Sequence, residues 1–106
     1  SGAYALLKQS GKFALSFLES GQKDLAFAFF RPTTVEGNTI NGAEFDRGAH
    51  SNAPVISATP AFVEGNYVGE VDMGDHSCVV GQVTNAVLKR DYSILTLKEC
   101  GVNYGG

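Results

Sequence analysis

Two long strand-like segments joined by a short turn limit what this chain can fold into. AFVEGNYVGEV (61–71) and HSCVVGQVTNAVL (76–88) are separated by Met73-Gly74-Asp75. Alternate residues of the second segment point to opposite faces, and neither face is strongly charged. A strand that is semi-apolar on both faces and has Gly81 in its middle fits a closed, strongly curved sheet. We therefore predict a small antiparallel β-barrel with two helices against it.

The first third of the chain predicts those two helices and the strand between them. Apolar residues at helical spacing over 3–10 predict a helix that ends at Gly11, where a left-handed cap costs little. KFALSFL (12–18) is apolar on both faces, which is typical of an internal strand. QKDLAFAFFR (22–31) predicts the second helix.

Two further segments complete the expected fold. Residues 31–59 are rich in Gly, Asn, Asp and Pro, which predicts a long loop with one or two short strands. YSILTLKE (92–99) predicts another strand, and the tail after it is expected to be irregular. No repeat, linker or composition shift divides the chain, so residues 1–106 are expected to form a single domain.

Composition and charge narrow the expected partners. The net charge is −3 and no basic run is present, so nucleic-acid binding has no electrostatic footprint. No apolar stretch approaches the roughly 20 residues of a membrane span. Cys78 and Cys100 lack zinc-site spacing and are expected to be buried structural cysteines in a reduced cytoplasm. Because the chain opens on Ser1-Gly2 without Met, we expect it to be part of a longer polypeptide.

The Gly74-Asp75-His76 step has two interpretations. It can be a plain turn, with positive φ at Gly74 and a backbone cap from Asp75. Alternatively, Asp75 fixes the tautomer or charge of His76, whose other ring nitrogen then faces a substrate or cofactor. No second histidine lies at ligand spacing, so no metal site is expected.

Six segments taken together resemble the flavin reductase-like FMN-binding domain. They are KFALSFL, the Phe-rich helix after it, VEGNTINGAEF, NAPVISATPAFVEG, GDHSCVVGQV and LTLKECGVNYGG. The resemblance covers nearly the whole chain and is to the later two-thirds of that domain. It implies a split β-barrel that forms a homodimer, binds FMN in a groove at or near the subunit interface, and takes electrons from NAD(P)H. The family's early strands, with a Ser- and Pro-containing flavin cradle, would lie before Ser1.

The resemblance also implies roles for individual residues. His76 matches the histidine of the family's GDH motif and would help to place the hydride donor, with Asp75 orienting it. The expected cofactor-binding residues are Ser16, Phe29, Phe30, Arg31 and Tyr104. Ser16 would offer a hydroxyl donor, the two phenylalanines would wall the ring, and Arg31 would approach the phosphate. Core packing of the phenylalanines, a solvated Arg31 and a Tyr104 that seals the barrel end are the alternatives.

Three functional hypotheses follow from the resemblance. The first is an FMN-binding oxidoreductase domain that passes electrons between NAD(P)H and flavin. The second is an electron-relay module of an oxygen-reducing flavodiiron protein, as in the cyanobacterial diflavin enzymes. The third is a non-catalytic split-barrel dimerisation module. The third is favoured by the missing cradle, by Ser16 where members often have Asn, and by Gly65 where they often have Cys.

Overall fold

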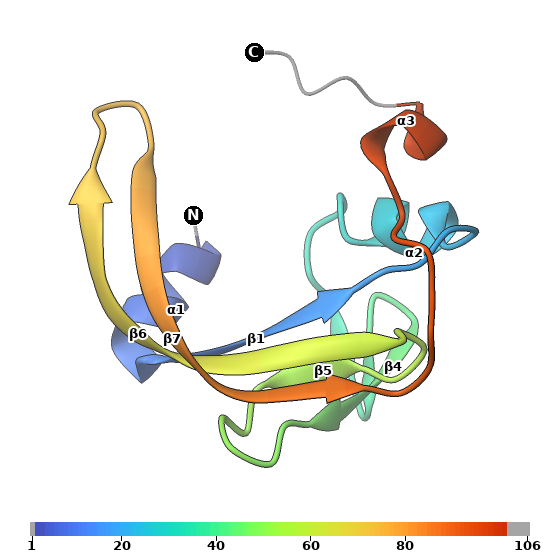
Figure 1. Cartoon of the computed structure of the whole chain (residues 1–106), viewed down its shortest axis with the longest axis horizontal. Coiled ribbons are helices and arrows are strands. Elements are labelled where there is room, and N and C mark those ends of the chain that lie inside the picture. Colours follow the sequence, from blue (N-terminus) through green and yellow to red (C-terminus); the bar gives the residue numbers. More distant parts are fainter. Residues whose placement is uncertain (1, 102–106) are drawn as a thin grey trace.

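The computed structural model describes residues 2–101 as two antiparallel sheets with three short helices (Figure 1). The first sheet has the order β1-β6-β7, with β1 (Lys12–Phe17), β6 (Ala61–Asp72) and β7 (Ser77–Leu88). The second has the order β2-β3-β4-β5, with β2 (Val35–Glu36), β3 (Thr39–Ile40), β4 (Ala43–Arg47) and β5 (Pro54–Ile56). The helices are α1 (Gly2–Ser10), α2 (Lys23–Ala28) and α3 (Leu97–Cys100). The predicted antiparallel, mainly β fold is confirmed.

The long β6–β7 hairpin is present and strongly bent. The two strands pair from Ala61↔Leu88 to Asp72↔Ser77, with register shifts after Glu64 and Tyr67. Such irregularities increase bend and twist, and Figure 1 shows the outer half of the hairpin turning away from β1 and from the strands β4 and β5, on the side where α1 lies. β1 pairs only with the inner half of β6, up to Asn66. Residues 67–81 therefore form a two-stranded projection, which we call the arm.

Two glycines in this hairpin leave room for the ring of Phe13. A Cβ atom at Gly65 would lie 2.4 Å from Phe13 Cζ and 2.6 Å from the carbonyl oxygen of Gln82. A Cβ atom at Gly81 would lie 2.6 Å from Phe13 Cε1. Gly81, from which the sequence predicted a curved sheet, thus lies under the ring of Phe13, which β1 places at the bend.

Gly65→Ala is expected to lower the free energy of unfolding by about 1–3 kcal/mol, the usual range for forcing an extra methyl into a packed site. Gly69→Ala on the same strand is the matched control, because nothing lies within 4 Å of its added Cβ. Urea unfolding followed by circular dichroism measures both variants. Equal midpoints for the two would contradict the close packing around Phe13.

The 31–59 segment contains more strand than predicted. It holds β2, β3, β4 and β5, where one or two strands were expected. The β3–β4 turn has φ of +50° at Asn41 and +83° at Gly42. Positive φ at two adjacent residues matches the right-handed twist of a hairpin, and Asn-Gly is the sequence that favours it. The dipeptide was therefore a readable signal for this hairpin.

The prediction of a strand over 92–99 is wrong. Only Ile94 forms an isolated bridge, with Glu19, and residues Leu97–Cys100 are the helix α3. The Thr96 side chain accepts a hydrogen bond from the backbone N–H of Glu99 at the start of this helix. A threonine followed three residues later by glutamate is a known helix-start pattern, which outweighed the β-branched residues before it.

The Glu99 carboxylate ties α3 to the turn before α2. It accepts hydrogen bonds from Ser20 Oγ and from the backbone N–H of Gly21, each at 2.6 Å. The hydrogen bond from Ser20, then that from Gly21, and the nearby charge of Lys23 lower the pKa of Glu99.

Two burial predictions are also wrong. β1 pairs with β6 on one side only and so lies at the edge of its sheet in the described part of the chain, rather than inside it. Cys78 is exposed, because it lies on the arm. The buried part of the fold is small, and it contains the charged residue Glu64 as well as apolar residues such as Phe45 and Val55.

Candidate functional site

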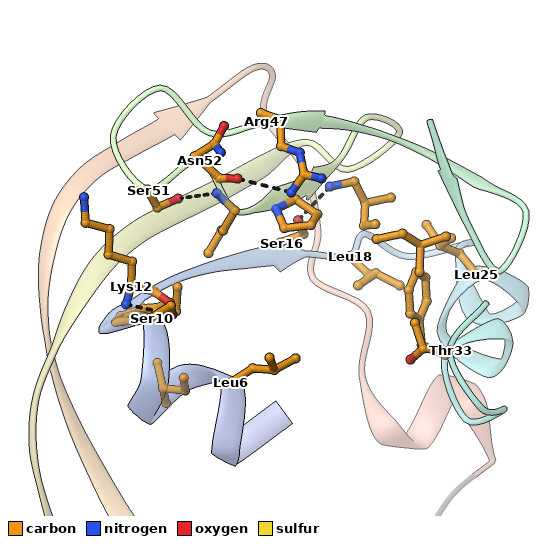
Figure 2. A pocket seen from close by; sticks show the side chains of 18 of the residues that line it. Leu6, Ser10, Lys12, Ser16, Leu18, Leu25, Thr33, Arg47, Ser51 and Asn52 are labelled. Atoms are coloured by element: carbon orange, nitrogen blue, oxygen red, sulfur yellow. Dashed lines mark hydrogen bonds between the residues drawn. The ribbon is translucent and has the colours of Figure 1, made fainter. Parts of the chain in front are cut away.

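A large groove lies between α1, β1, α2 and the strands β4 and β5 (Figure 2). Its volume is about 1090 Å³, slightly above the usual range of about 300–1,000 Å³ for small-molecule sites. Most of its lining is apolar, with Leu6 from α1, Leu18 after β1 and Leu25 from α2 among the contributors. A ligand with a broad apolar body could therefore be enclosed here.

The charged side chains of the groove are both cations. Lys12 at the start of β1 and Arg47 at the end of β4 line it, and its lining contains no Asp or Glu. Among residues 2–101, no ion pair joins either cation to a carboxylate. The groove is thus locally positive on a chain whose net charge is −3. This combination favours a ligand that carries an anionic group on an apolar body.

Ser16 lies in the groove, between the two sheets. The backbone N–H of Ile56 on β5 donates to Ser16 Oγ at 3.0 Å, so β5 approaches β1 through a side chain (Figure 2). A hydroxyl that accepts one hydrogen bond still has its own proton to donate. Ser16 can therefore present one donor to a ligand in the groove.

A tight turn over residues 48–53 forms the wall opposite α1. Its backbone is closed by hydrogen bonds from Gly48 N to Ala53 O at 2.8 Å and from Asn52 N to Gly48 O at 2.9 Å. Arg47 Nη1 donates to Asn52 O at 3.2 Å, which attaches the guanidinium to the turn (Figure 2). Ser51, Asn52 and Ala53 all line the groove.

Behind this turn lies the carboxylate of Glu64, which is fully buried. Burial raises the pKa of this carboxyl, but hydrogen bonds from Asn85, Ser51 and the backbone of His50 outweigh burial and lower the pKa from 4.5 to about 2. Glu64 is therefore ionised at neutral pH although it is shielded from water. It does not line the groove itself.

The structure separates the residues expected to bind the cofactor. Ser16 and Phe29 line the groove, whereas Phe30 and Arg31 lie beyond α2 and do not. Phe30 is 69% exposed and stacks edge-on against Phe27. Arg31 Nε donates to the carbonyl of Ala28 at 3.4 Å. Tyr104 lies outside the described residues.

The Gly74-Asp75-His76 step forms the tip of the arm. Gly74 has the predicted positive φ, +93°, and its N–H donates to Asp72 Oδ1 at 2.9 Å, so Asp72 supplies the backbone cap expected from Asp75. Asp75 Oδ1 lies 2.7 Å from His76 Nδ1, which leaves Nε2 available. The side chains of His76 and Asp75 are 71% and 89% exposed, and neither residue lines the groove of its own chain.

Sequence reasoning missed Arg47 and the 48–53 turn as parts of the site. The only local signals were a basic residue at a strand end and the Gly48 and Asn52 of a turn, which are common features. Within residues 2–101, no group of three or more His, Cys, Asp or Glu side chains could hold a metal ion. No helix in that range has the length and apolar character needed to cross a membrane.

Comparison with known families and curated proteins gives one consistent result. The family described as "Flavin reductase like domain" matches residues 1–102. A "Probable flavin reductase" of Rhizobium meliloti (strain 1021) is 27% identical over 81 residues, which are 76% of this chain and 25% of that protein. A "Ferric-chelate reductase (NAD(P)H)" of Archaeoglobus fulgidus is 29% identical over 92 residues, which are 85% of this chain and 54% of that protein.

A solved structure supports the same relationship. The Streptomyces globisporus C-1027 NADH:FAD oxidoreductase SgcE6 superposes with a TM-score of 0.72 at 28% identity. The superposition covers 83% of this chain and 52% of SgcE6. The chain thus spans about half, or less, of the length of these relatives.

Proposed function

The chain belongs to the flavin reductase-like domain family, and from this we propose that its groove binds FMN and that the domain passes electrons between NAD(P)H and flavin. The observation that carries the proposal is the composition of the groove. Its walls are apolar, and its charged side chains are the two cations Lys12 and Arg47. FMN combines a large planar ring with a phosphate group, and a groove of about 1090 Å³ has room for it.

Different residues of the groove would contact different parts of FMN. Lys12 and Arg47 would hold the phosphate, and the planar guanidinium of Arg47 can donate two parallel hydrogen bonds to it. Ser16 would donate its hydroxyl proton to the polar edge of the ring system. Leu6, Leu18 and Phe29 would keep water away from the ring. When bound, the flavin would supply the redox chemistry by accepting a hydride from NAD(P)H.

The same proposal includes a homodimer, because the arm is poorly covered in one chain. Large apolar side chains on and beside the arm are more than a third exposed: Val68, Val71, Met73, Val79, Val80 and Val83. An isolated two-stranded ribbon is marginally stable in water, so a second copy that covers these residues would stabilise it. In that arrangement His76 at the tip of one arm would serve the groove of the partner. We place this dimer in the cytoplasm, where the free thiols Cys78 and Cys100 would stay reduced.

Arg47→Gln is expected to raise the Kd for FMN about tenfold, because it removes a charge-assisted contact to the phosphate. Flavin fluorescence quenching on the full chain gives the Kd. Arg31→Gln is the matched control, since Arg31 lies outside the groove. Riboflavin, which lacks the phosphate, should bind wild type and Arg47→Gln equally well. If Arg31→Gln raised the Kd for FMN more than Arg47→Gln did, the phosphate would bind at Arg31, as expected from the sequence.

His76→Ala is expected to slow NAD(P)H-driven flavin reduction at least tenfold while the Kd for FMN stays within about twofold, as for loss of a group that assists the transfer step. Stopped-flow absorbance of the flavin measures the rate. His50→Ala, which changes the other exposed histidine, should reduce flavin at the wild-type rate. Equal rates of flavin reduction in His76→Ala and His50→Ala would contradict a role of His76 in the transfer step.

The titration also separates the other two hypotheses. Saturable FMN binding without NAD(P)H-driven reduction would favour the electron-relay module, which would then receive its electrons from a donor other than NAD(P)H. Failure of the wild-type chain to bind FMN or FAD would favour the dimerisation module.

A further inference from the structure

We propose that Glu64 is a positioning residue for the groove: its buried carboxylate fixes the 48–53 turn, and the turn fixes Arg47 where a flavin phosphate would meet it. The inference rests on the proposed function, because it takes the groove as the flavin site. Three linked contacts support it: Asn85 on β7 holds the Glu64 carboxylate, the carboxylate holds the 48–53 turn, and the turn holds Arg47 in the groove.

The first contact anchors the carboxylate to the sheet. Glu64 lies on β6 directly opposite Asn85 on β7. Asn85 Nδ2 donates to Glu64 Oε2 at 2.7 Å, and the Glu64 residue has no exposed surface. One carboxylate oxygen is thereby held from a neighbouring strand, which fixes the direction of the other.

The second contact runs from the other oxygen to the turn. Glu64 Oε1 accepts hydrogen bonds from Ser51 Oγ at 2.7 Å, Ser51 N at 2.8 Å and His50 N at 3.1 Å. Ser51 Oγ also accepts from Ala53 N at 3.0 Å. The turn comes so close that a Cβ atom at Gly48 would lie 2.0 Å from Glu64 Oε1. The turn thus wraps around one oxygen atom.

The third contact joins the turn to Arg47 in the groove. The carbonyl of Asn52, at the corner of the turn, accepts from Arg47 Nη1 at 3.2 Å. Asn52 has φ of +58°, a left-handed turn conformation that asparagine adopts more readily than most non-glycine residues. If the turn loosens, Arg47 loses this partner and must be ordered again when a phosphate binds, which weakens affinity.

All four groups that contact the carboxylate are hydrogen-bond donors, two from side chains and two from the backbone. A protonated acid or an amide in its place would therefore bring one of its own donors against one of these donors. This makes a paired exchange possible. Glu64→Gln alone places an NH₂ group within the donor shell. Combined with Asn85→Asp, the new amide nitrogen can donate to the new carboxylate, while the amide oxygen still accepts from the turn.

The test compares Ser51→Ala, Glu64→Gln and the pair Glu64→Gln/Asn85→Asp with Val87→Ala. The last is a control that removes apolar volume from β7, opposite Phe62, at a residue that makes no side-chain hydrogen bond to Glu64 or to the turn. FMN affinity is measured by fluorescence quenching and amide exchange at residues 50–53 by NMR without flavin. We expect about tenfold weaker FMN binding and at least tenfold faster exchange at His50 and Ser51 in the first two variants. The paired exchange should recover most of both losses, and Val87→Ala should bind FMN as wild type does.

Unchanged exchange and affinity in a folded Ser51→Ala variant would overturn the proposal, as would an equal loss of affinity in Val87→Ala, which would indicate general destabilisation. If the wild-type chain binds no FMN, the proposed function fails. The exchange rates then still decide whether Glu64 holds the turn: faster exchange in Ser51→Ala and Glu64→Gln supports that anchoring, and unchanged exchange overturns it.

Discussion

Replacing Glu64 with leucine is expected to lower the free energy of unfolding by about 4 kcal/mol or more, since a buried donor left without a partner costs about 1–3 kcal/mol. Four hydrogen bonds from Asn85, Ser51 and His50 would lose their acceptor. A domain of this size is stable by only about 5–15 kcal/mol, so the loss is a large part of the total. Urea unfolding at neutral pH, followed by circular dichroism, gives the difference.

Glu44→Leu is the control for this substitution, because Glu44 is exposed on β4. Its free energy of unfolding should stay within about 0.5 kcal/mol of wild type. If Glu64→Leu were equally mild, apolar packing would have replaced the hydrogen-bonded carboxylate without loss, as is known for some buried polar groups. The stabilising role given to the Glu64 contacts would then be wrong.

Acid is expected to destabilise the protein between pH 4.5 and about 2, the interval set by the Glu64 carboxyl. In the unfolded chain this group takes up its proton near its ordinary pKa of 4.5, whereas in the folded chain it does so near 2. The unfolded state therefore binds the proton first as the pH falls. The stabilisation is complete above about pH 5 and is lost progressively below it, by up to about 3 kcal/mol.

Unfolding midpoints in urea at a series of pH values measure this dependence. Glu99 contributes in the same direction, because its pKa is also lowered in the folded chain. Glu64→Gln lacks the titrating group, so its stability should vary less with pH below 5 than that of wild type. Parallel curves for wild type and Glu64→Gln would show that other carboxylates govern the acid response.

The sequence by itself determined the features that depend on neighbouring residues. Alternation over 61–88 and the positive φ expected at Gly74 predicted the β6–β7 hairpin, and Gly11 predicted the end of α1. The physical reason is local: backbone sterics and a strand period of two residues act within a few positions. The same local logic explains the missed β3–β4 hairpin and the wrong strand over 92–99, since the Asn41-Gly42 turn and the Thr96 cap were readable but received less weight than composition.

Only the tertiary structure decided which residues share the groove. Arg31 follows a phenylalanine-rich helix and was the expected phosphate partner, yet Arg47 is the arginine that lines the groove. Glu64 gave no signal in the sequence, because its partners are 13 to 21 residues away and meet only when β6, β7 and the turn are assembled. Hydrogen bonds of this kind depend on the pairing register and bend of the sheet, which no short stretch of the chain specifies.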